Sequence, residues 1–356
     1  MMKSILCYPL VVGLVLLTLA GCKDTNKVQA EQQSLVKEVL AEMVPVEGGS
    51  FMMGDFGRRV AEHLPYSLDM DNKPEHKVTL DSFKIAKYKV TWGQFNRYRA
   101  ILGLPKTASY NDLKSSDPDY EYLNRSTGDN YPASVYWQEA KDYCQWLGKM
   151  SGKKVDLPTE AQWEYAARSR GQLFIFASNN NEYGYKENFA SRISPVGSYP
   201  PNPLGLYDMM GNGTDWVNDW YSADYYQHSP EHNPQGPEHG NKKVMRGMSG
   251  GDGVFSTTIT RDKDWFENGK LVPLGYGFRC VVNYSETKNP TLDLKDSHDG
   301  EKPTVNPLNR GCRKRVEVTF SSIKLNSITD FGQPVICMDN RLKIIPNIRA
   351  TALDKL

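Results

Sequence analysis

The sequence predicts an α+β fold in which short strands and two helices are joined by irregular segments. Residues 45–54 alternate apolar residues with glycine, as a strand, a turn and a strand do, and residues 78–88 alternate again. Apolar residues at helical spacing follow in residues 137–150. Further on, glycine and proline recur among isolated aromatic residues, which favours irregular structure held by buried rings.

The two helices are predicted from different signals. In residues 137–150 the apolar side chains that share one helical face are Trp137, Ala140, Tyr143, Cys144 and Leu147. The second helix begins after Thr159, because a threonine followed three residues later by Gln162 is a capping-box pattern. We expect this helix to end near Arg168.

The first 21 residues are typical of an export signal. Lys3 gives a positive start, and residues 4–20 form an almost wholly apolar run that is short for a membrane span. The run ends in Leu-Ala-Gly-Cys22, which resembles a bacterial lipobox, so we expect Cys22 to be lipidated. More than one acyl chain on Cys22 gives stable membrane attachment. An uncleaved helical anchor is the alternative.

Four further regions are predicted after the signal peptide of residues 1–21. Residues 22–42 are polar and suit a tether, although a short helix from residue 31 to 43 is compatible with them. Residues 43–284 form the main domain, residues 285–311 a polar linker, and residues 312–356 a small β tail. In the tail, Val316, Val318 and Phe320 alternate with polar residues, and residues 334–337 are the candidate partner strand.

Charge and cysteine content restrict the compartment and the partners. The formal net charge is only +1 and the basic residues are scattered, so nothing indicates nucleic-acid binding. Lys23 directly after Cys22 resembles lipoproteins that are sent to the outer membrane, which predicts a periplasmic protein on its inner leaflet. That compartment is oxidising, and the four cysteines beyond Cys22 therefore predict two disulfides.

Three motifs resemble the formylglycine-generating enzyme, or sulfatase-modifying factor, family. They are DLPTEAQWEYAAR at residues 156–168, LGLYDMMGNGTDW at 204–216, and RGMSGGDG at 246–253. Further blocks match in the same order, and the last ends in GFRC at 277–280. The resemblance covers roughly residues 43–284 and implies an irregular α+β fold that is distantly like C-type lectin domains.

The family's catalytic chemistry is not carried over with the fold. In catalytic members two cysteines a few residues past the block that matches residues 246–249, the start of the third motif, bind copper(I), for which soft thiolates are the suitable ligands. Those positions fall at Asp252 and Thr257 here, so we expect no copper. The remaining catalytic candidates in this cleft are Arg246, Ser249 and Asp252.

The resemblance also implies a disulfide and a metal site. Cys144 and Cys280 match positions that are disulfide-bonded in the family, which leaves Cys312 and Cys337 as a second pair in the tail. The set that matches the family's calcium block is Asn212, Gly213 and Asp215. Carboxylate and amide oxygens are ligands that calcium prefers, so calcium is expected there; turn-capping is the alternative for the same residues.

These observations predict a catalytically silent domain on a lipid anchor. Its role is binding or assembly, with a protein partner in the envelope; an immunity factor against a secreted antibacterial effector is one form of that role. The alternative is an oxidoreductase or tautomerase like the family's periplasmic enzyme of pyoverdine maturation, which would use the cleft at Arg246, Ser249 and Asp252. Direct formylglycine generation is a third and weaker reading, because the thiols are absent.

Overall fold

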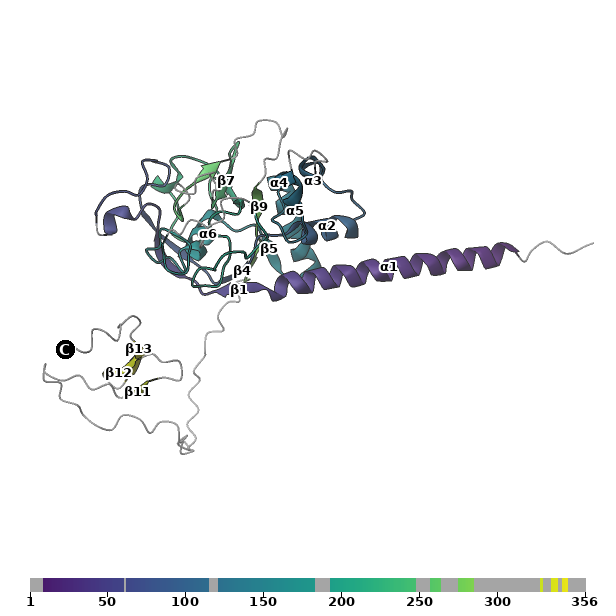
Figure 1. Cartoon of the computed structure of the whole chain (residues 1–356), viewed down its shortest axis with the longest axis horizontal. Helices are drawn as coiled ribbons and strands as arrows, with labels where there is room; N and C mark the ends of the chain where they lie inside the picture. The colour runs from purple at the N-terminus through teal and green to yellow at the C-terminus, as the bar shows by residue number, and fades with distance from the viewer. Residues whose placement is uncertain are drawn as a thin grey trace, which may run out of the picture. The chain divides into compact units, whose positions relative to one another are not determined.

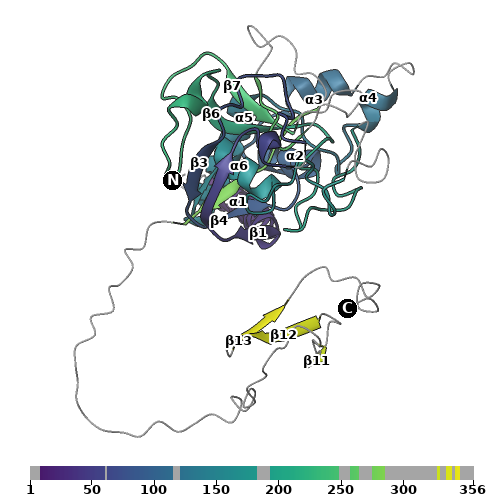
Figure 2. The ribbon, with the colours of Figure 1, turned by 90° about the vertical axis from the view of Figure 1, so that its left-hand side faces the viewer.

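A computed structural model describes residues 9–60, 62–114, 121–182, 193–247, 257–263 and 275–284, together with three short strands between residues 327 and 344. The chain divides into two compact units, Met1–Pro290 and Thr291–Leu356. The first unit carries all the helices described here. Both views show β7 on one side of its body and helices α2, α3 and α4 on the other (Figures 1 and 2).

The helices of the first unit are α1 Pro9–Ala41, α2 Trp92–Ile101, α3 Ala108–Leu113, α4 Glu121–Arg125, α5 Trp137–Ser151 and α6 Glu160–Ala167, with 3-10 turns η1 Gly57–Arg59 and η3 Tyr225–Gln227. Thr159 starts α6 as predicted: its hydroxyl accepts from the Gln162 backbone, and the Gln162 side chain accepts from the Thr159 backbone. Helix α5 ends at Gly152, whose φ of 67° is a conformation that favours glycine.

The strands of the first unit form three small sheets. Sheet one has the order β1-β4-β10-β5, sheet two β8-β7-β6-β9, and β2 pairs with β3. Their bounds are β1 Met43–Val46, β2 Gly49–Met53, β3 His76–Leu80, β4 Phe83–Ala86, β5 Lys154–Asp156, β6 Thr214–Trp220, β7 Lys243–Arg246, β8 Asp262–Lys263, β9 Tyr276–Phe278 and β10 Val281–Asn283. Only β6 and β9 run parallel among these pairs.

The predicted α+β class and irregular fold are confirmed. The strand, turn and strand of residues 45–54 are β1 and β2, which join different sheets. One large core lies between α5 and its neighbours. It includes the rings of Phe95, Tyr143 and Phe278, which pack in tilted and edge-on pairs. A second core lies between α6 and all three sheets, including the β2–β3 pair.

Helix α1 differs from the tether expected for residues 22–42. It is continuous to Ala41, and its last turns bury Leu35, Val36 and Val39 against the main core. Arg97 of α2 pairs with Glu31 and Glu38 of α1, each at 2.6 Å. The polar composition of residues 22–42 gave no sign of this packing. Three apolar residues within five positions are nevertheless enough for one buried helical stripe.

The N-terminal residues and the tail are described only in part. Residues 1–8 lie outside the described residues, and of Cys22 only the backbone, within α1, is described. Within the described chain, no helix is long and apolar enough to span a membrane. In the second unit β12 Pro334–Met338 pairs with β11 Ser327–Ile328 and β13 Arg341–Ile344. The expected partner strand with Val316, Val318 and Phe320 lies outside the described residues, as does Cys312.

Candidate functional site

Arg246 is the last residue of β7 and the first residue of the RGMSGGDG motif, which resembles the family's active-site motif. Its side chain is fully buried and points at α6. Nη1 lies 2.7 Å from Glu160 Oε1, and Nη2 lies 2.8 Å from Glu164 Oε2. Glu160 and Glu164 are four residues apart, so both carboxylates leave α6 on one face.

Two more arginines complete this buried ion network. Arg261 approaches the carboxylate of Glu160 through Nε at 2.7 Å and Nη2 at 3.1 Å, which is a bidentate pair. Arg168 lies 2.9 Å from Glu164. Burial acts to raise the pKa of Glu160, but the charges of Arg261 and Arg246 outweigh it, and the pKa is lowered.

The network gives Arg246 a structural role, and a catalytic role for it stays a prediction. Both terminal nitrogens of its guanidinium pair with carboxylates inside the core, so its side chain joins β7 to α6. Removing one partner of such a network leaves an uncompensated buried charge. Ser249 and Asp252 lie outside the described residues. Thr257, at the second copper-ligand position, bonds its hydroxyl to Thr260 Oγ1 at 2.8 Å.

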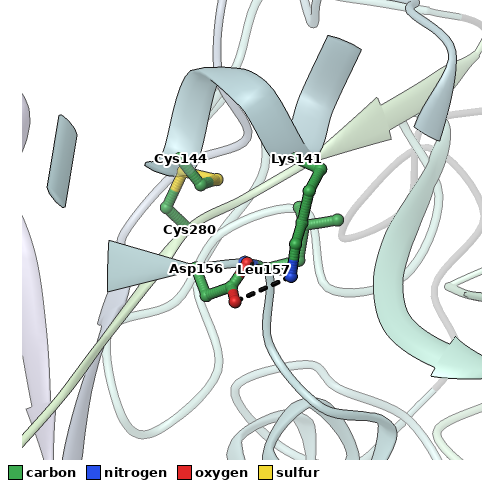
Figure 3. Close-up of a disulfide and its surroundings, with 5 residues drawn as sticks. All are labelled: Lys141, Cys144, Asp156, Leu157 and Cys280. Carbon is green, nitrogen blue, oxygen red and sulfur yellow. Dashed lines mark hydrogen bonds and ion pairs between the residues drawn. A yellow bond between two sulfur atoms is a disulfide. The ribbon is translucent and has the colours of Figure 1, made fainter. Parts of the chain in front are cut away.

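The disulfide implied by the family resemblance is present. Cys144 of α5 is bonded to Cys280, which directly precedes β10, across 136 residues of sequence. Both cysteines are fully buried. Figure 3 shows the bond beside Lys141 of the same helix, whose Nζ lies 2.7 Å from the Asp156 carboxylate of β5. The bond and the ion pair therefore fasten α5 to sheet one at two points.

The residues proposed for calcium do not fit a calcium site. Asp215 is fully buried, and its carboxylate lies 2.9 Å from Lys89 Nζ and 2.8 Å from Arg279 Nε. Trp163 Nε1 donates to the same carboxylate at 2.9 Å. Two cations already surround this carboxylate, so a divalent ion beside it would be repelled. The asparagine of the block, Asn212, accepts from the backbone N–H of Ser194 at 2.9 Å.

The same centre shifts two pKa values in a linked way. Burial lowers the pKa of Lys89 to about 8, although Asp215 opposes the shift. Burial acts to raise the pKa of Asp215, but Arg279 and Lys89 together outweigh it and lower the pKa. The carboxylate is therefore held ionised by two cations. Gly213 of the same block has a φ of +89° and leaves no room for a Cβ beside the Gly275 carbonyl, which explains a glycine there without a metal.

Two perturbed groups were missed in the sequence. Burial and the charge of Glu160 raise the pKa of Asp219 to about 7. Burial lowers the pKa of Lys243 to about 8, and its Nζ lies 4.0 Å from the ring centre of Trp137 and 3.6 Å from that of Trp220. The sequence signal for Asp219 is the TDWVNDW strand, in which each of two aspartates precedes a tryptophan. Five of its seven residues are buried.

Two cavities in the part of the chain that the structure describes have none of Glu160, Glu164 and Arg246 in their lining. One of about 510 Å³ lies between α1 and the body of the domain, and its lining includes Glu38, Lys87, Tyr88, Arg97 and Asp129. A smaller one of about 190 Å³ is lined by carboxylates and amides, among them Asp81, Asp156, Asn218 and Asn283. Charges of both signs line the larger cavity, so it indicates no single ligand chemistry.

Comparison with protein families gives one match, to the sulfatase-modifying factor enzyme 1-like domain, over residues 28–284. This chain belongs to that family. The match begins inside the segment predicted as a tether, in agreement with the packing of α1 on the domain. Within residues 28–284 of this sulfatase-modifying factor domain, the sequence contains only Cys144 and Cys280, and they are bonded to each other.

Curated relatives of two kinds are similar to this chain. The serine/threonine-protein kinase pkn1 of Chlamydia pneumoniae is 34% identical over 274 residues, which cover 72% of this chain and 40% of that protein. The chain thus spans well under half the length of that relative. The formylglycine-generating enzyme of Streptomyces coelicolor is 30% identical over 58% of this chain and 77% of the enzyme.

Two solved structures support the fold. PvdO from Pseudomonas aeruginosa matches with a TM-score of 0.55 and 27% identity, over 68% of this chain and 94% of PvdO. Treponema denticola variable protein 1 matches with a TM-score of 0.51 and 19% identity, over 67% of this chain and 94% of that protein. The second likeness concerns the fold alone.

Proposed function

We propose that this protein is a lipid-anchored periplasmic envelope protein whose sulfatase-modifying factor domain is catalytically silent and serves as a protein-binding or assembly module. The observation that carries the proposal is that residues 28–284 contain no free cysteine. Both cysteines of the domain are consumed by the buried disulfide, and Asp252 and Thr257 stand where the family's copper ligands are expected. A carboxylate and a hydroxyl are hard ligands without disulfide-exchange chemistry.

A direct assay tests the silence of the domain. The purified protein is incubated with copper(I) and a cysteine-containing sulfatase peptide, and the Streptomyces coelicolor enzyme serves as the positive control. We expect no formylglycine by mass spectrometry and no retained copper. Formation of formylglycine by the unmodified chain would overturn the proposal. The Asp252→Cys/Thr257→Cys variant is the matched comparison, since it restores the missing thiols.

A second experiment tests the binding role. The lipid-free protein is used to capture partners from envelope and secreted fractions, and bound material is identified by mass spectrometry. A stoichiometric protein partner supports the module, and its nature distinguishes an assembly component from an effector that an immunity factor neutralises. A retained small molecule, with no protein partner, would instead support an enzyme.

The alternative of a periplasmic oxidoreductase or tautomerase is favoured by one observation. PvdO is covered over 94% of its length at 27% identity, so the likeness extends through almost the whole of that protein. Arg246 counts against this alternative, because its side chain is fully buried and both of its terminal nitrogens pair with Glu160 and Glu164. The Ser249→Ala/Asp252→Asn variant distinguishes the binding module from the enzyme. Only an enzyme that uses this cleft is expected to lose turnover in the variant, whereas a binding module should keep its protein partner.

A further inference from the structure

Exposed apolar side chains gather on the loop between η1 and β3. Nine large apolar side chains are exposed in the described chain, and four of them lie within residues 64–70, which we name the apolar loop. Their exposed fractions are 63% for Leu64, 46% for Tyr66, 98% for Leu68 and 72% for Met70. Clusters of this kind on a soluble domain mark interaction sites, whereas single exposed residues do not.

Buried anchors hold the apolar loop in place. The carboxylate of Asp55 is fully buried and accepts the backbone N–H groups of Gly57 at 2.9 Å and of Tyr66 and Ser67 at 3.1 Å. Burial acts to raise the pKa of Asp55, but these hydrogen bonds and Lys73 outweigh it, and the pKa is lowered. The ring of Tyr66 packs edge-on against buried Phe56, with ring centres 5.4 Å apart.

Lys73 closes the loop from the other side. Its Nζ lies 3.3 Å from Asp55 Oδ2, donates to the carbonyl of Ser67 at 2.8 Å, and also donates to the carbonyl of Asp69. The loop is therefore built with its polar backbone turned inward and its apolar side chains turned outward. A surface that is already ordered loses little conformational freedom when it binds.

The charge of the apolar loop specifies its partner. From residue 62 to 72 the chain carries three carboxylates, Glu62, Asp69 and Asp71, and no lysine or arginine. The nearest ammonium, that of Lys73, faces inward. Anionic lipid surfaces repel such a segment, whereas a protein groove that is apolar inside and basic at its rim complements it. Leu68 is almost fully exposed, and a concave apolar receptor would bury the most of its side chain.

The base of the apolar loop lies beside the segment that ends the family's active-site block. The hydroxyl of Tyr221 donates to Asp71 at 2.9 Å, Arg261 donates to the backbone carbonyl of Asp71, and Asn72 donates to the backbone carbonyl of Ile259. Residues 258–261 follow directly on Thr257, the second of the two positions where catalytic relatives are expected to carry copper ligands. A partner on this loop is thus held next to a region whose chemistry has been lost.

We propose that residues 64–70 are a preformed docking loop that inserts Leu64, Leu68 and Met70 into an apolar groove with a basic rim on a partner protein. This inference rests on the proposed binding function and assigns a surface to it. It makes Asp69, between the two most exposed apolar side chains, the residue that selects for basic charge in the receptor.

Site-specific photo-crosslinking in the source cell tests the proposal. The full-length chain carries a photo-reactive amino acid at position 68 or, as the matched control, at exposed Leu104, and crosslinked peptides are sequenced by mass spectrometry. We expect a single protein adduct from position 68, with lysine or arginine beside apolar residues in the partner peptide. With that partner purified, Leu68→Ser/Met70→Ser and Asp69→Lys should each weaken binding at least roughly tenfold, while Leu102→Ser/Leu104→Ser stays within about twofold.

The outcomes separate this inference from the proposed function. An adduct from position 104 but none from position 68 would overturn the docking loop and leave a binding module that uses another surface. An absence of adducts at every exposed position tried would count against both. Lipid adducts at position 68, together with sedimentation of the lipid-free protein with phosphatidylglycerol vesicles, would show that the loop meets a bilayer and would overturn the protein groove. Unchanged melting temperatures of the variants establish that they fold.

Discussion

The carboxyl group of Asp219 is buried where β6 meets the start of α6, and it accepts the backbone N–H of Glu160 at 2.8 Å. Burial and the charge of Glu160 raise its pKa to about 7. A raised carboxyl pKa contributes stability that is fully present below the unfolded pKa of about 4 and is lost as the pH rises through about 7. This residue therefore makes the fold less stable in its ionised form.

Asp219→Asn keeps the hydrogen-bond acceptor and removes the ionisation. We expect the stability of the variant relative to the wild type to rise between roughly pH 4 and roughly pH 7 and to stay constant above that, because only the wild type loses free energy of unfolding between its unfolded and folded pKa values. Urea unfolding at several pH values measures the difference. The exposed Asp69→Asn change is the control, and parallel curves for wild type and Asp219→Asn would contradict the assignment.

The motif that contains Asp215 located this carboxylate in the sequence but did not predict its ion-pair partners. The motif located a functional-looking carboxylate, but Lys89 and Arg279, which decide its role, come from segments 126 and 64 residues away. We expect Asp215→Ala to destabilise the domain by about 3–5 kcal/mol, since it leaves two buried cations uncompensated. Removal of calcium with a chelator should leave the melting temperature of the wild type unchanged. A chelator-dependent loss of stability would restore the calcium reading.

At the scale of elements, α1 carries the clearest prediction. Leu35 is fully buried in the main core, whereas Val28 on the same helix is 43% exposed. Leu35→Ala should therefore lower the free energy of unfolding by about 2–4 kcal/mol, and Val28→Ala by less than about 0.5 kcal/mol. Chemical denaturation of the two variants tests whether α1 belongs to the fold. Equal, small effects would return residues 22–42 to the role of a tether.

The elements that the sequence predicted correctly have local causes. Residues 137–150 were predicted from apolar side chains at helical spacing, and residues 160–168 from the Thr159–Gln162 cap. Both signals lie within a short stretch of sequence. The error at α1 arose because its buried stripe is short and its partner residues, such as Arg97, come from another helix. The ion network of Arg246 could not be predicted from the sequence for the same reason. Glu160 and Arg261 come close to Arg246 only in the folded chain.

At the scale of the whole molecule, the family match and the lack of a free cysteine in residues 28–284 both favour the proposed binding module. Residues 28–284 match the family, and the two cysteines among them, Cys144 and Cys280, are bonded to each other. A frame of this kind keeps its surface loops free to diverge. In the proposed function, the apolar loop and the anchor at Cys22 are the two parts of the chain that would connect it to other molecules.

The anchor gives the last prediction. Acyl chains contribute roughly 0.8 kcal/mol per buried methylene, so a lipidated Cys22 should hold the whole chain in the membrane fraction. Cys22→Ser should lose labelling by a fatty-acid probe and leave the membrane pellet or remain unprocessed, whereas Cys7→Ser, in the same apolar run, should behave as the wild type. Lys23→Asp should keep the label but move the protein from the outer to the inner membrane. Continued labelling of Cys22→Ser would place the modification elsewhere and remove Cys22 from the proposed function.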